Sequence, residues 1–520
     1  RSTSIVRLKP PLCGGAFDRR DLLRFALQEF PLYMSGCLFS NNRAPSTSHG
    51  ALAINAMTLS QDLSHLILRS AFFNNSAGNA GAIMIATAPS NLLYFVLEGC
   101  TLAENTAVSG EGARGGVLLV QGGGVGFVRN STFLSNRAES GAAAYAGDSF
   151  ALHLIGCTFL SNRATGSQDI TLSRGGALLA TVEATLNMSD CAFTNNSADL
   201  GGAIHLEEAA SGRVQASSLR ENVASSGGAI RVQGFASMHL MGAHLALNRA
   251  VIETDWVSDC SAAGRDTSQC ATGGAVIVTE SADLQLQGTT AQENSAETYG
   301  GFLYCSTSGD VIIRDSSVLG NNAVRAGGGS IMWLLREGRE PDIDTMSVLA
   351  ENSAAYGTLG ESLATDPQSF QLITNDSLFE AVTSGQAMPE VTFLYFDRYQ
   401  TEVQFAQGVD ADIFMEMTVI SGEGTPLLEG QTSAKYQAGG ATISGAVLYG
   451  YPNETYLTRL TVGGHDSLDL NVTLVELEVW AEGGLHVGRR EGTVLSAMNH
   501  SHAYGPIASL ERNADLSCGR

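Results

Sequence analysis

A short phrase recurs along most of this chain, and the recurrence constrains the fold more than any other feature. The phrase places an aromatic or aliphatic residue shortly before Asn-x-Ala, as in "STFLSNRA" (131–138) and "CAFTNNSA" (191–198). The shortest interval between copies is 26 residues, which is too short for a domain but fits one coil of a solenoid. Aligned on the last Asn of the phrase, the eleven copies form a column of Asn42, Asn75, Asn105, Asn136, Asn162, Asn196, Asn222, Asn248, Asn294, Asn322 and Asn352.

A second phrase, Gly-Gly-Ala-aliphatic, follows most copies of the first, as in "GGAI" at 201–204 and 227–230. The apolar runs between the phrases are only three to six residues long and are rich in β-branched and small residues. Gly, Asn and Ser bound these runs, which is typical of short strands joined by sharp corners. The pattern predicts a parallel β-helix, and chain chirality favours the right-handed form.

Each phrase has a predicted structural role in such a coil. Gly-Gly can adopt positive φ and turn a corner without a Cβ penalty. The repeated Asn tolerates left-handed backbone, and its amide can hydrogen-bond to the equivalent Asn above and below. The Asn column is therefore interpreted as structural rather than catalytic. The aromatic residues expected to stack inside successive coils are Phe39, Phe73, Phe133, Phe159 and Phe193.

The repeat fades after Asn352, and the texture changes from about residue 389 to alternating strands of five to nine residues. This spacing predicts an antiparallel β-sandwich that is immunoglobulin-like in broad architecture. The expected all-β chain consists of a β-helix of about twelve coils at 1–362 with a loop insertion at 249–272, a linker or cap at 363–388, a β-sandwich at 389–482 and an irregular tail at 483–520.

The charge balance limits the classes of partner. The formal net charge is −23, which argues against nucleic acid and against anionic membrane surfaces as partners. No apolar run approaches the length of a membrane-spanning helix, so we expect no membrane insertion within this sequence. The opening "RSTSIVRL" lacks both a Met and a signal-peptide pattern, and we interpret the sequence as a piece of a longer precursor.

Glycosylation motifs point to the outside of a cell. Asn-x-Ser/Thr is the acceptor sequence for N-linked glycans in secreted proteins, and four of the copies lie beyond the repeats. We therefore expect an extracellular or cell-surface location. The candidate acceptors are Asn74, Asn130, Asn187, Asn195, Asn375, Asn453, Asn471 and Asn499.

Six of the nine cysteines fall into two groups. Four of them occupy one position of the repeat and are interpreted as buried small residues, namely Cys37, Cys100, Cys157 and Cys191. Cys260 and Cys270 instead lie inside the loop insertion, where we predict a disulfide worth roughly 2–3 kcal/mol in the entropic model. The pairing of Cys13, Cys305 and Cys518 is left open by the sequence.

No residues show the spacing of a catalytic set or of a metal site. Arg137, Arg163 and Arg249 follow the repeated Asn, and we interpret them as solvated corner residues. The expectation is therefore an absence of catalytic residues, of metal ligands and of a cofactor. Turn aspartates in "DADIF" (410–414) and "GGHDSLD" (463–469) leave only a weak candidate for calcium in the sandwich loops.

The paired motifs resemble the repeats of the chlamydial polymorphic outer-membrane proteins. The carrying residues are "FLSN" (133–136 and 159–162), "FTNN" (193–196) and the two "GGAI" copies, and the similarity covers about residues 14–354. The resemblance implies a β-helical passenger displayed at a cell surface with adhesin-like roles. The sequons suit a eukaryotic route, so similar repeats in large surface proteins of algae and protists are the closer comparison.

The predicted fold is also similar to the pectin-lyase-like right-handed β-helix superfamily, which contains enzymes. Two hypotheses of function follow. The first is a non-enzymatic, adhesin-like or structural surface protein, a rigid rod that binds a protein or glycan at a face of the solenoid. The alternative is a polysaccharide lyase or hydrolase of the pectin-lyase-like class, which requires a charged patch along one groove of the solenoid.

Overall fold

A computed structural model describes the fold. It describes residues 6–8, 23–25, 32–44, 50–56, 63–89, 93–108, 112–166, 172–251, 271–325, 327–334, 338–354, 362–365, 369–374, 376–403, 414–435, 440–462 and 466–475. Two compact units are present, one formed by residues 1–368 with 397–409, the other by 369–396 with 410–520. The first unit is a parallel β-solenoid, as the repeat predicted, and almost no helix occurs in the described residues.

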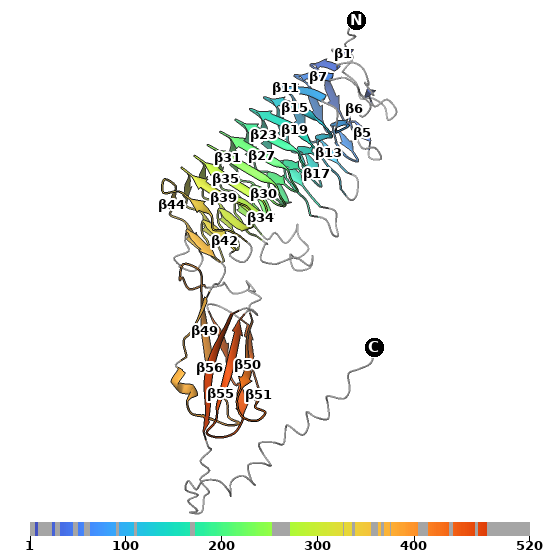
Figure 1. The fold of residues 1–520 in the computed structure, drawn as a ribbon. Helices are drawn as coiled ribbons and strands as arrows, with labels where there is room; N and C mark the ends of the chain where they lie inside the picture. The colour runs from blue at the N-terminus through green and yellow to red at the C-terminus, as the bar shows by residue number, and fades with distance from the viewer. Residues whose placement is uncertain are drawn as a thin grey trace, which may run out of the picture. The chain divides into compact units, whose positions relative to one another are not determined.

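Four parallel sheets, here called A to D, run along the solenoid, and each coil adds one strand to each sheet. The chain passes through the sheets in the order A, C, D, B, and each strand pairs in register with its equivalent in the next coil. In Figure 1 the strands of sheet A follow one another as a diagonal row from β7 to β39.

The strands of the two larger sheets are as follows. Sheet A contains β1 (Val6–Leu8), β3 (Leu32–Ser35), β7 (Leu63–Leu68), β11 (Leu93–Glu98), β15 (Gly124–Arg129), β19 (Phe150–Ile155), β23 (Thr185–Ser189), β27 (Ser211–Gln215), β31 (Ser237–Met241), β35 (Asp283–Gln287), β39 (Val311–Arg314) and β43 (Asp342–Ile343). Sheet B contains β2 (Leu23–Phe25), β6 (Leu52–Ala56), β10 (Ile83–Thr87), β14 (Leu118–Gln121), β18 (Ala144–Ala146), β22 (Leu178–Ala180), β26 (Ile204–Leu206), β30 (Ile230–Val232), β34 (Val276–Glu280), β38 (Leu303–Thr307), β42 (Ile331–Trp333) and β46 (Leu363–Thr365).

The strands of the other two sheets are shorter. Sheet C contains β4 (Leu38–Ser40), β8 (Ala71–Phe73), β12 (Thr101–Ala103), β16 (Thr132–Leu134), β20 (Thr158–Leu160), β24 (Ala192–Thr194), β28 (Ser218–Arg220), β32 (His244–Ala246), β36 (Thr290–Gln292), β40 (Ser317–Leu319) and β44 (Val348–Ala350). Sheet D contains β5 (Arg43–Ala44), β9 (Ser76–Ala77), β13 (Thr106–Ala107), β17 (Arg137–Ala138), β21 (Arg163–Ala164), β25 (Ser197–Leu200), β29 (Val223–Ser226), β33 (Arg249–Ala250), β37 (Ser295–Ala296), β41 (Asn322–Ala323) and β45 (Ser353–Ala354).

Aromatic rings from sheet C stack inside the solenoid. The rings of Phe133 and Phe159 lie 4.7 Å apart, and those of Phe159 and Phe193 lie 4.6 Å apart. Near the N-terminus Phe39 stacks on Phe72 at 4.9 Å, whereas Phe73 is 40% exposed. The sequence prediction of Phe73 was therefore one residue off, because alternate residues of a strand point to opposite faces.

The repeated asparagines form a buried ladder at the corner between sheets C and D. Nδ2 of Asn196 donates to Oδ1 of Asn222 and to the carbonyl oxygen of Phe159, each at 3.0 Å. The backbone N–H of Asn196 also donates to Oδ1 of Asn222 at 3.0 Å. Each step thus satisfies buried polar groups that would otherwise cost about 1–3 kcal/mol each.

The ladder includes ten of the eleven predicted positions, but its tenth step runs through Asn321 instead of Asn322. Nδ2 of Asn294 donates to Oδ1 of Asn321, and Nδ2 of Asn321 donates to Oδ1 of Asn352, each at 2.9 Å. Asn322 lies on β41 and is only partly buried. The ladder residue is the Asn two positions before the buried Ala of sheet D, here Ala323, so aligning on the last Asn gave the wrong residue.

The left-handed backbone lies one residue before the ladder Asn, which corrects the role that the sequence suggested. Asn195, Glu221 and Leu247 have φ values of 54°, 56° and 57°, and each precedes a ladder Asn. The ladder Asn itself is absent from the positive-φ residues of the described chain. Its side chain is needed for hydrogen bonding, whereas the strained turn position accepts several residue types.

Glycine is required at the two positions of the second phrase for different physical reasons. Gly201 has a φ of 63°, so it turns the corner before sheet B. Gly202 is not in the left-handed region, but a Cβ added there would lie 2.1 Å from the carbonyl oxygen of Gly228 in the next coil. The second glycine is therefore required by the close approach of backbone from neighbouring coils.

The repeat cysteines belong to a second hydrogen-bonded column, between sheets A and C. Oγ of Ser131 accepts the N–H of Cys100 at 3.1 Å, and Oγ of Ser217 accepts the N–H of Cys191 at 3.0 Å. Cys100, Cys157 and Cys191 are free and buried. The contact with the Cys157 thiol, together with burial, raises the pKa of the Cys191 thiol, which disfavours a reactive thiolate there.

The remaining cysteines divide between described and undescribed residues. Cys37 is disulfide-bonded, and Cys305 is a free, buried cysteine. The disulfide predicted between Cys260 and Cys270 lies outside the described residues, as do Cys13 and Cys518.

The predicted domain boundaries differ from the division into two units. Strand β46 is the last strand of sheet B, so residues 363–365 continue the solenoid rather than begin a linker. Residues 397–409 also group with the solenoid. There the guanidinium of Arg398 lies over the ring of Trp333 and pairs with Glu340 at 2.9 Å, while Nε1 of Trp333 donates to the hydroxyl of Tyr399 at 3.2 Å.

The second unit is built mainly from antiparallel strands. A five-stranded sheet contains β48 (Val382–Thr383), β56 (Asp466–Val475), β55 (Thr455–Val462), β50 (Phe414–Ser421) and β52 (Ser433–Lys435). Smaller sheets contain β47 (Ser369–Leu372), β49 (Val391–Phe396) and β53 (Ala441–Ile443), and β51 (Leu427–Glu429) with β54 (Val447–Tyr449). A single 3₁₀ turn, η3 (Asp376–Phe379), precedes β48. The immunoglobulin-like topology stays a prediction, and the tail at 483–520 lies outside the described residues.

Candidate functional site: the outer face of sheet A

The four sheets of the solenoid differ in how much of their outer side reaches solvent. The central coils give sheet A strands of five or six residues, whereas sheet C has strands of three and sheet D of two to four. The outward residues of sheet B from Leu119 to Met332 are buried, including Leu179 at 2%, His205 at 0% and Tyr304 at 1% exposure. Among the described residues, sheet A therefore presents the broadest strand face to solvent.

Three columns of outward side chains cover this face, because equivalent strands pair in register from coil to coil. The middle column changes from apolar to polar along the solenoid. In chain order it contains Tyr33, Leu66, Val96, Phe127, His153, Asn187, Arg213, His239, Gln285, Ile312 and Asp342.

The half of the face nearer the N-terminus is apolar. Tyr94 and Ile155 are 38% and 36% exposed. The ring of Phe127 stacks on that of His153 at 4.8 Å, and the guanidinium of Arg129 lies 5.3 Å from the Phe127 ring centre. This half offers flat, weakly hydrated surface, which suits contact with the apolar faces of a partner.

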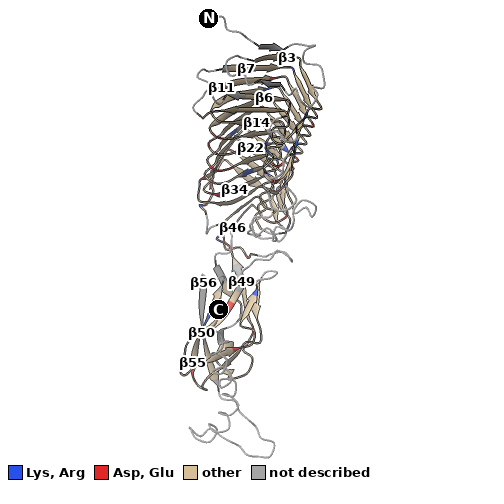
Figure 2. Cartoon of the chain, turned by 90° about the vertical axis from the view of Figure 1, so that its right-hand side faces the viewer, with Lys and Arg blue, Asp and Glu red and all other residues tan. Residues whose placement is uncertain are grey.

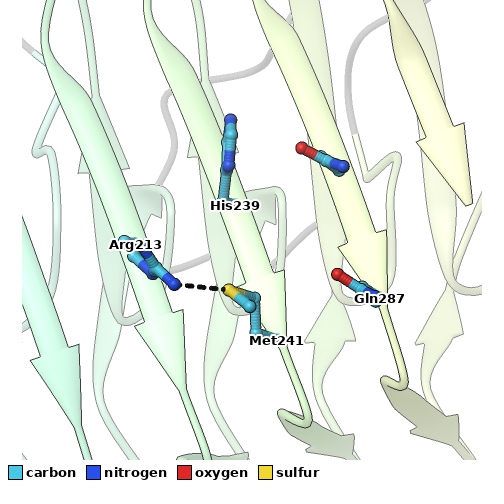
Figure 3. Close-up of a pocket in the computed structure, with 5 residues that line it drawn as sticks. Arg213, His239, Met241 and Gln287 are labelled. Carbon is cyan, nitrogen blue, oxygen red and sulfur yellow. Dashed lines mark hydrogen bonds between the residues drawn. The ribbon is translucent and has the colours of Figure 1, made fainter. Parts of the chain in front are cut away.

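The other half is polar and contains an open groove. The groove has a volume of about 210 Å³ and lies over β27, β31 and β35. Its lining residues, four of which are labelled in Figure 3, are Arg213, His239, Met241, Gln285 and Gln287. Nη2 of Arg213 donates to Sδ of Met241 at 3.0 Å, which directs the guanidinium across the groove towards the next strand.

Sheet B carries a different kind of polar cluster, centred on the buried His205 and Glu207, with the exposed Arg174 at its edge. Nη1 of Arg174 contacts both carboxylate oxygens of Glu207, at 2.9 and 3.0 Å, and Nε2 of Gln233 donates to the same carboxylate at 3.2 Å. Nε2 of His205 lies 3.3 Å from Oε2 of Glu207. Burial lowers the pKa of His205, so its ring is neutral near pH 7.

The chemistry of this cluster is consistent with a structural role. Burial alone would raise the pKa of Glu207, but its hydrogen bond with His205 and the charge of Arg174 lower it overall. His205 is completely buried, so it cannot contact a substrate without an opening of the coil. The cluster was not anticipated from the sequence, since Arg174 and Gln233 come from the coils before and after that of His205 and Glu207 and share no motif with them.

The predicted glycosylation sites occupy varied positions. Asn130, Asn195 and Asn453 are exposed, whereas Asn74 and Asn187 are half-buried. Asn187 lies on sheet A, at the boundary between the apolar and polar halves. Asn375 and Asn499 lie outside the described residues, and the side chain of Asn471 on β56 is likewise not described.

The predicted arginine column lies on sheet D, outside the face of sheet A. Arg137 and Arg163 are in register on β17 and β21, and Arg249 is on β33. Arg137 and Arg249 are exposed.

No group of three or more His, Cys, Asp or Glu side chains suited to a metal occurs within the described residues. The calcium candidate at 410–414 lies almost wholly outside those residues, and the side chains of 463–469 are not described. In the part of the chain that the structure describes, no helix has the length and apolarity that crossing a membrane would require. Charged residues are sparse along the solenoid, whose cartoon in Figure 2 is mainly tan.

Comparison with known proteins gives one short match. The model of the Chlamydia polymorphic membrane protein repeat matches residues 190–207, which span β24, β25 and β26. No curated protein and no solved structure matches the chain. The match and the parallel solenoid support a repeat of the polymorphic-membrane-protein type, a kind of repeat associated with surface proteins.

Proposed function

We propose that this chain is a non-enzymatic recognition protein of the cell surface or extracellular space, an adhesin-type rod whose ligand binds the outer face of sheet A. The observation that carries the proposal is the contrast in burial between the sheets. Sheet A exposes a broad strand face with ordered columns of side chains, while the equivalent face of sheet B is covered.

The repeat match and the exposed sequons support the surface location. The ligand is a protein or glycan, because the face combines an aromatic half with a hydrogen-bonding half. The net charge of −23 disfavours a nucleic acid, which is a polyanion.

The enzyme alternative lacks a supporting arrangement. A lyase or hydrolase needs an acid–base pair in reach of a bound substrate. The buried pair of His205 and Glu207 is engaged with Arg174 and has no exposed ring atom. The groove of sheet A has a histidine, His239, but no carboxylate in its lining.

The test uses charge-introducing variants on two faces. Val96→Glu and Gln215→Glu alter sheet A, and Thr158→Glu is the matched control on the outer side of sheet C. Adhesion of the purified chain to a panel of cells and to a glycan array should fall for the first two variants only. Equal loss for all three, or none, would contradict the proposal.

The same preparation also tests the enzyme alternative. It is incubated with acidic polysaccharides, and unsaturated product or new reducing ends are measured. Release of product that survives purification to homogeneity would replace the recognition proposal with the enzyme reading.

A further inference from the structure

We propose that the groove over β27, β31 and β35 is a subsite for an anionic group of a saccharide, a carboxylate or a sulfate, which Arg213 binds. This inference rests on the proposed function and names the class of ligand that its polar half would take. Arg213 is a cation on an exposed strand face of an acidic chain.

The guanidinium of Arg213 has no carboxylate partner among the described residues. The ion pairs of the described chain lie elsewhere, and its one hydrogen bond goes to the thioether of Met241. A thioether is a weak acceptor, whereas a guanidinium has five N–H donors in a planar fork. The fork matches a carboxylate or a sulfate, to which Arg binds by two parallel hydrogen bonds.

Two acids at the edge of the same face, Asp283 and Asp310, do not pair with Arg213. Asp283 on β35 is two strands and two residues away from Arg213, or roughly 12 Å by strand geometry. This exceeds the Debye length of about 8 Å at physiological ionic strength. Asp283 and Asp310 are also occupied, since Asp283 accepts the N–H of Asp310 at 2.7 Å and Asp310 pairs with Arg339 at 2.9 Å.

The other groove residues suit the hydroxyl groups of a saccharide. His239, Gln285 and Gln287 have side chains with no hydrogen-bond partner within the described part of the chain. Each amide offers two donors and an acceptor, and the imidazole offers one of each. Because strands lie about 4.8 Å apart, a chain of sugars laid across them meets a new polar side chain at each coil.

The composition of the groove favours a saccharide over a protein as its occupant. Protein hot spots are built around aromatic anchors in desolvated pockets. Here the lining is polar and open, with Met241 as its one apolar member. The aromatic residues of this face lie in the other half, around Phe127.

The test compares saccharides that differ only in charge. Calorimetry with the purified chain uses hexagalacturonate against its methyl ester, and sulfated cellohexaose against cellohexaose. These arms distinguish a carboxylate from a sulfate as the source of the charge. We expect one charged member of a pair to bind at least tenfold more tightly than its neutral partner, with an affinity that falls as salt is raised.

Variants assign the effect to the groove. Arg213→Gln should weaken binding of the charged saccharide about tenfold, the size of one lost charge-assisted contact. Arg213→Lys should bind more tightly than Arg213→Gln but more weakly than the wild type, because lysine keeps the positive charge and lacks the planar pair of N–H donors. Arg137→Gln is the matched control, since it removes an exposed arginine from β17 of sheet D, outside the face of sheet A. Thermal melting checks that all three variants fold.

The outcomes separate this inference from the proposed function. Equal affinity for charged and neutral saccharides, or an unchanged affinity in Arg213→Gln, would overturn the anionic subsite. If cell or glycan adhesion still depends on Val96 and Gln215 in that case, the recognition function of sheet A stands. Adhesion that is insensitive to every sheet A variant would overturn both.

Discussion

Sheets A and B are built from the same coils, with the same parallel pairing, yet the outer side of sheet A is exposed to solvent and that of sheet B is buried. The outer column of sheet A passes from Phe127 to Arg213 and Gln285 and stays in contact with solvent. The corresponding column of sheet B contains Leu179 and His205, which are buried. The repeat therefore determines the residue types of the inward columns and of the corners, whereas the residue types of the outward columns vary from coil to coil.

The corner before sheet B and the corner after sheet A should differ most in their tolerance of a side chain. Gly202 precedes sheet B, and a Cβ there meets backbone of the next coil at 2.1 Å. Gly242 follows sheet A, and a Cβ there meets nothing within 4 Å. We expect Gly202→Ala to lower the free energy of unfolding by about 3 kcal/mol through overpacking. Gly242→Ala should cost only about 1 kcal/mol, from its φ of 57°. Urea unfolding of both variants checks this, and equal losses would remove the distinction between the corners.

The inner side of sheet A should respond to acid through His65. His65 points inward on β7, accepts the N–H of Leu32 at 3.2 Å, and has its pKa lowered by burial from 6.5 to about 4. The unfolded chain binds a proton below pH 6.5, while the folded chain does so only near pH 4. Stability that is present above pH 6.5 is therefore lost as the pH falls, by about 2 kcal/mol at pH 5.

The variant His65→Leu should flatten this pH dependence, since its column neighbours Leu32 and Phe95 are apolar. Gln287→Leu, an apolar substitution at an exposed position of the same sheet that does not titrate, should leave the dependence unchanged. Urea unfolding between pH 7.5 and 4 measures both. A wild-type slope that persists in His65→Leu would assign the acid sensitivity to other groups.

The buried network of sheet B should be more sensitive than the polar groove of sheet A. Glu207→Gln removes the carboxylate charge that Arg174 and His205 contact, and we expect a loss of about 1–2 kcal/mol from the weakened hydrogen bonds of this largely buried side chain. Gln285→Ala in the groove should change stability by less than about 0.5 kcal/mol. Thermal melting of the two variants is sufficient, and a larger effect at Gln285 would reverse the comparison.

The smallest effect is expected at the boundary between the two halves of sheet A. Asn187→Gln removes a sequon from a half-buried outward position and should leave the free energy of unfolding within about 0.5 kcal/mol. In a secretory host it should also remove any glycan from this face, so that ligand binding stays equal or increases. Weaker binding in the variant would show that Asn187 or its glycan contributes to recognition.

The sequence predicted the solenoid because its corners recur. Asn196 and Gly202 are fixed by contacts with their own equivalents in the next coil, so the same residue types must return at each turn. Errors arose where one copy allowed two alignments. In "NNA" at 321–323 and "FFNN" at 72–75, only the side-chain direction distinguishes the buried residue from its neighbour.

The candidate site was not predictable in the same way. The groove residues Arg213, His239 and Gln285 are spaced 26 and 46 residues apart and share no motif. They become neighbours through the strand register, which the outward side chains do not themselves determine. A register table built from the corner phrases would have placed them in one column, but it would not have shown that sheet A is exposed while sheet B is buried.

One step of the Asn ladder separates the length of the chain from the geometry of the solenoid. Asn248 and Asn294 are 46 residues apart, yet their amide contact of 2.9 Å equals that of the 26-residue step from Asn222 to Asn248. A coil can therefore contain an insertion of about twenty residues at one corner without a change in the spacing of the strands of sheet A. The spacing between coils thus stays constant when a loop is inserted at a corner.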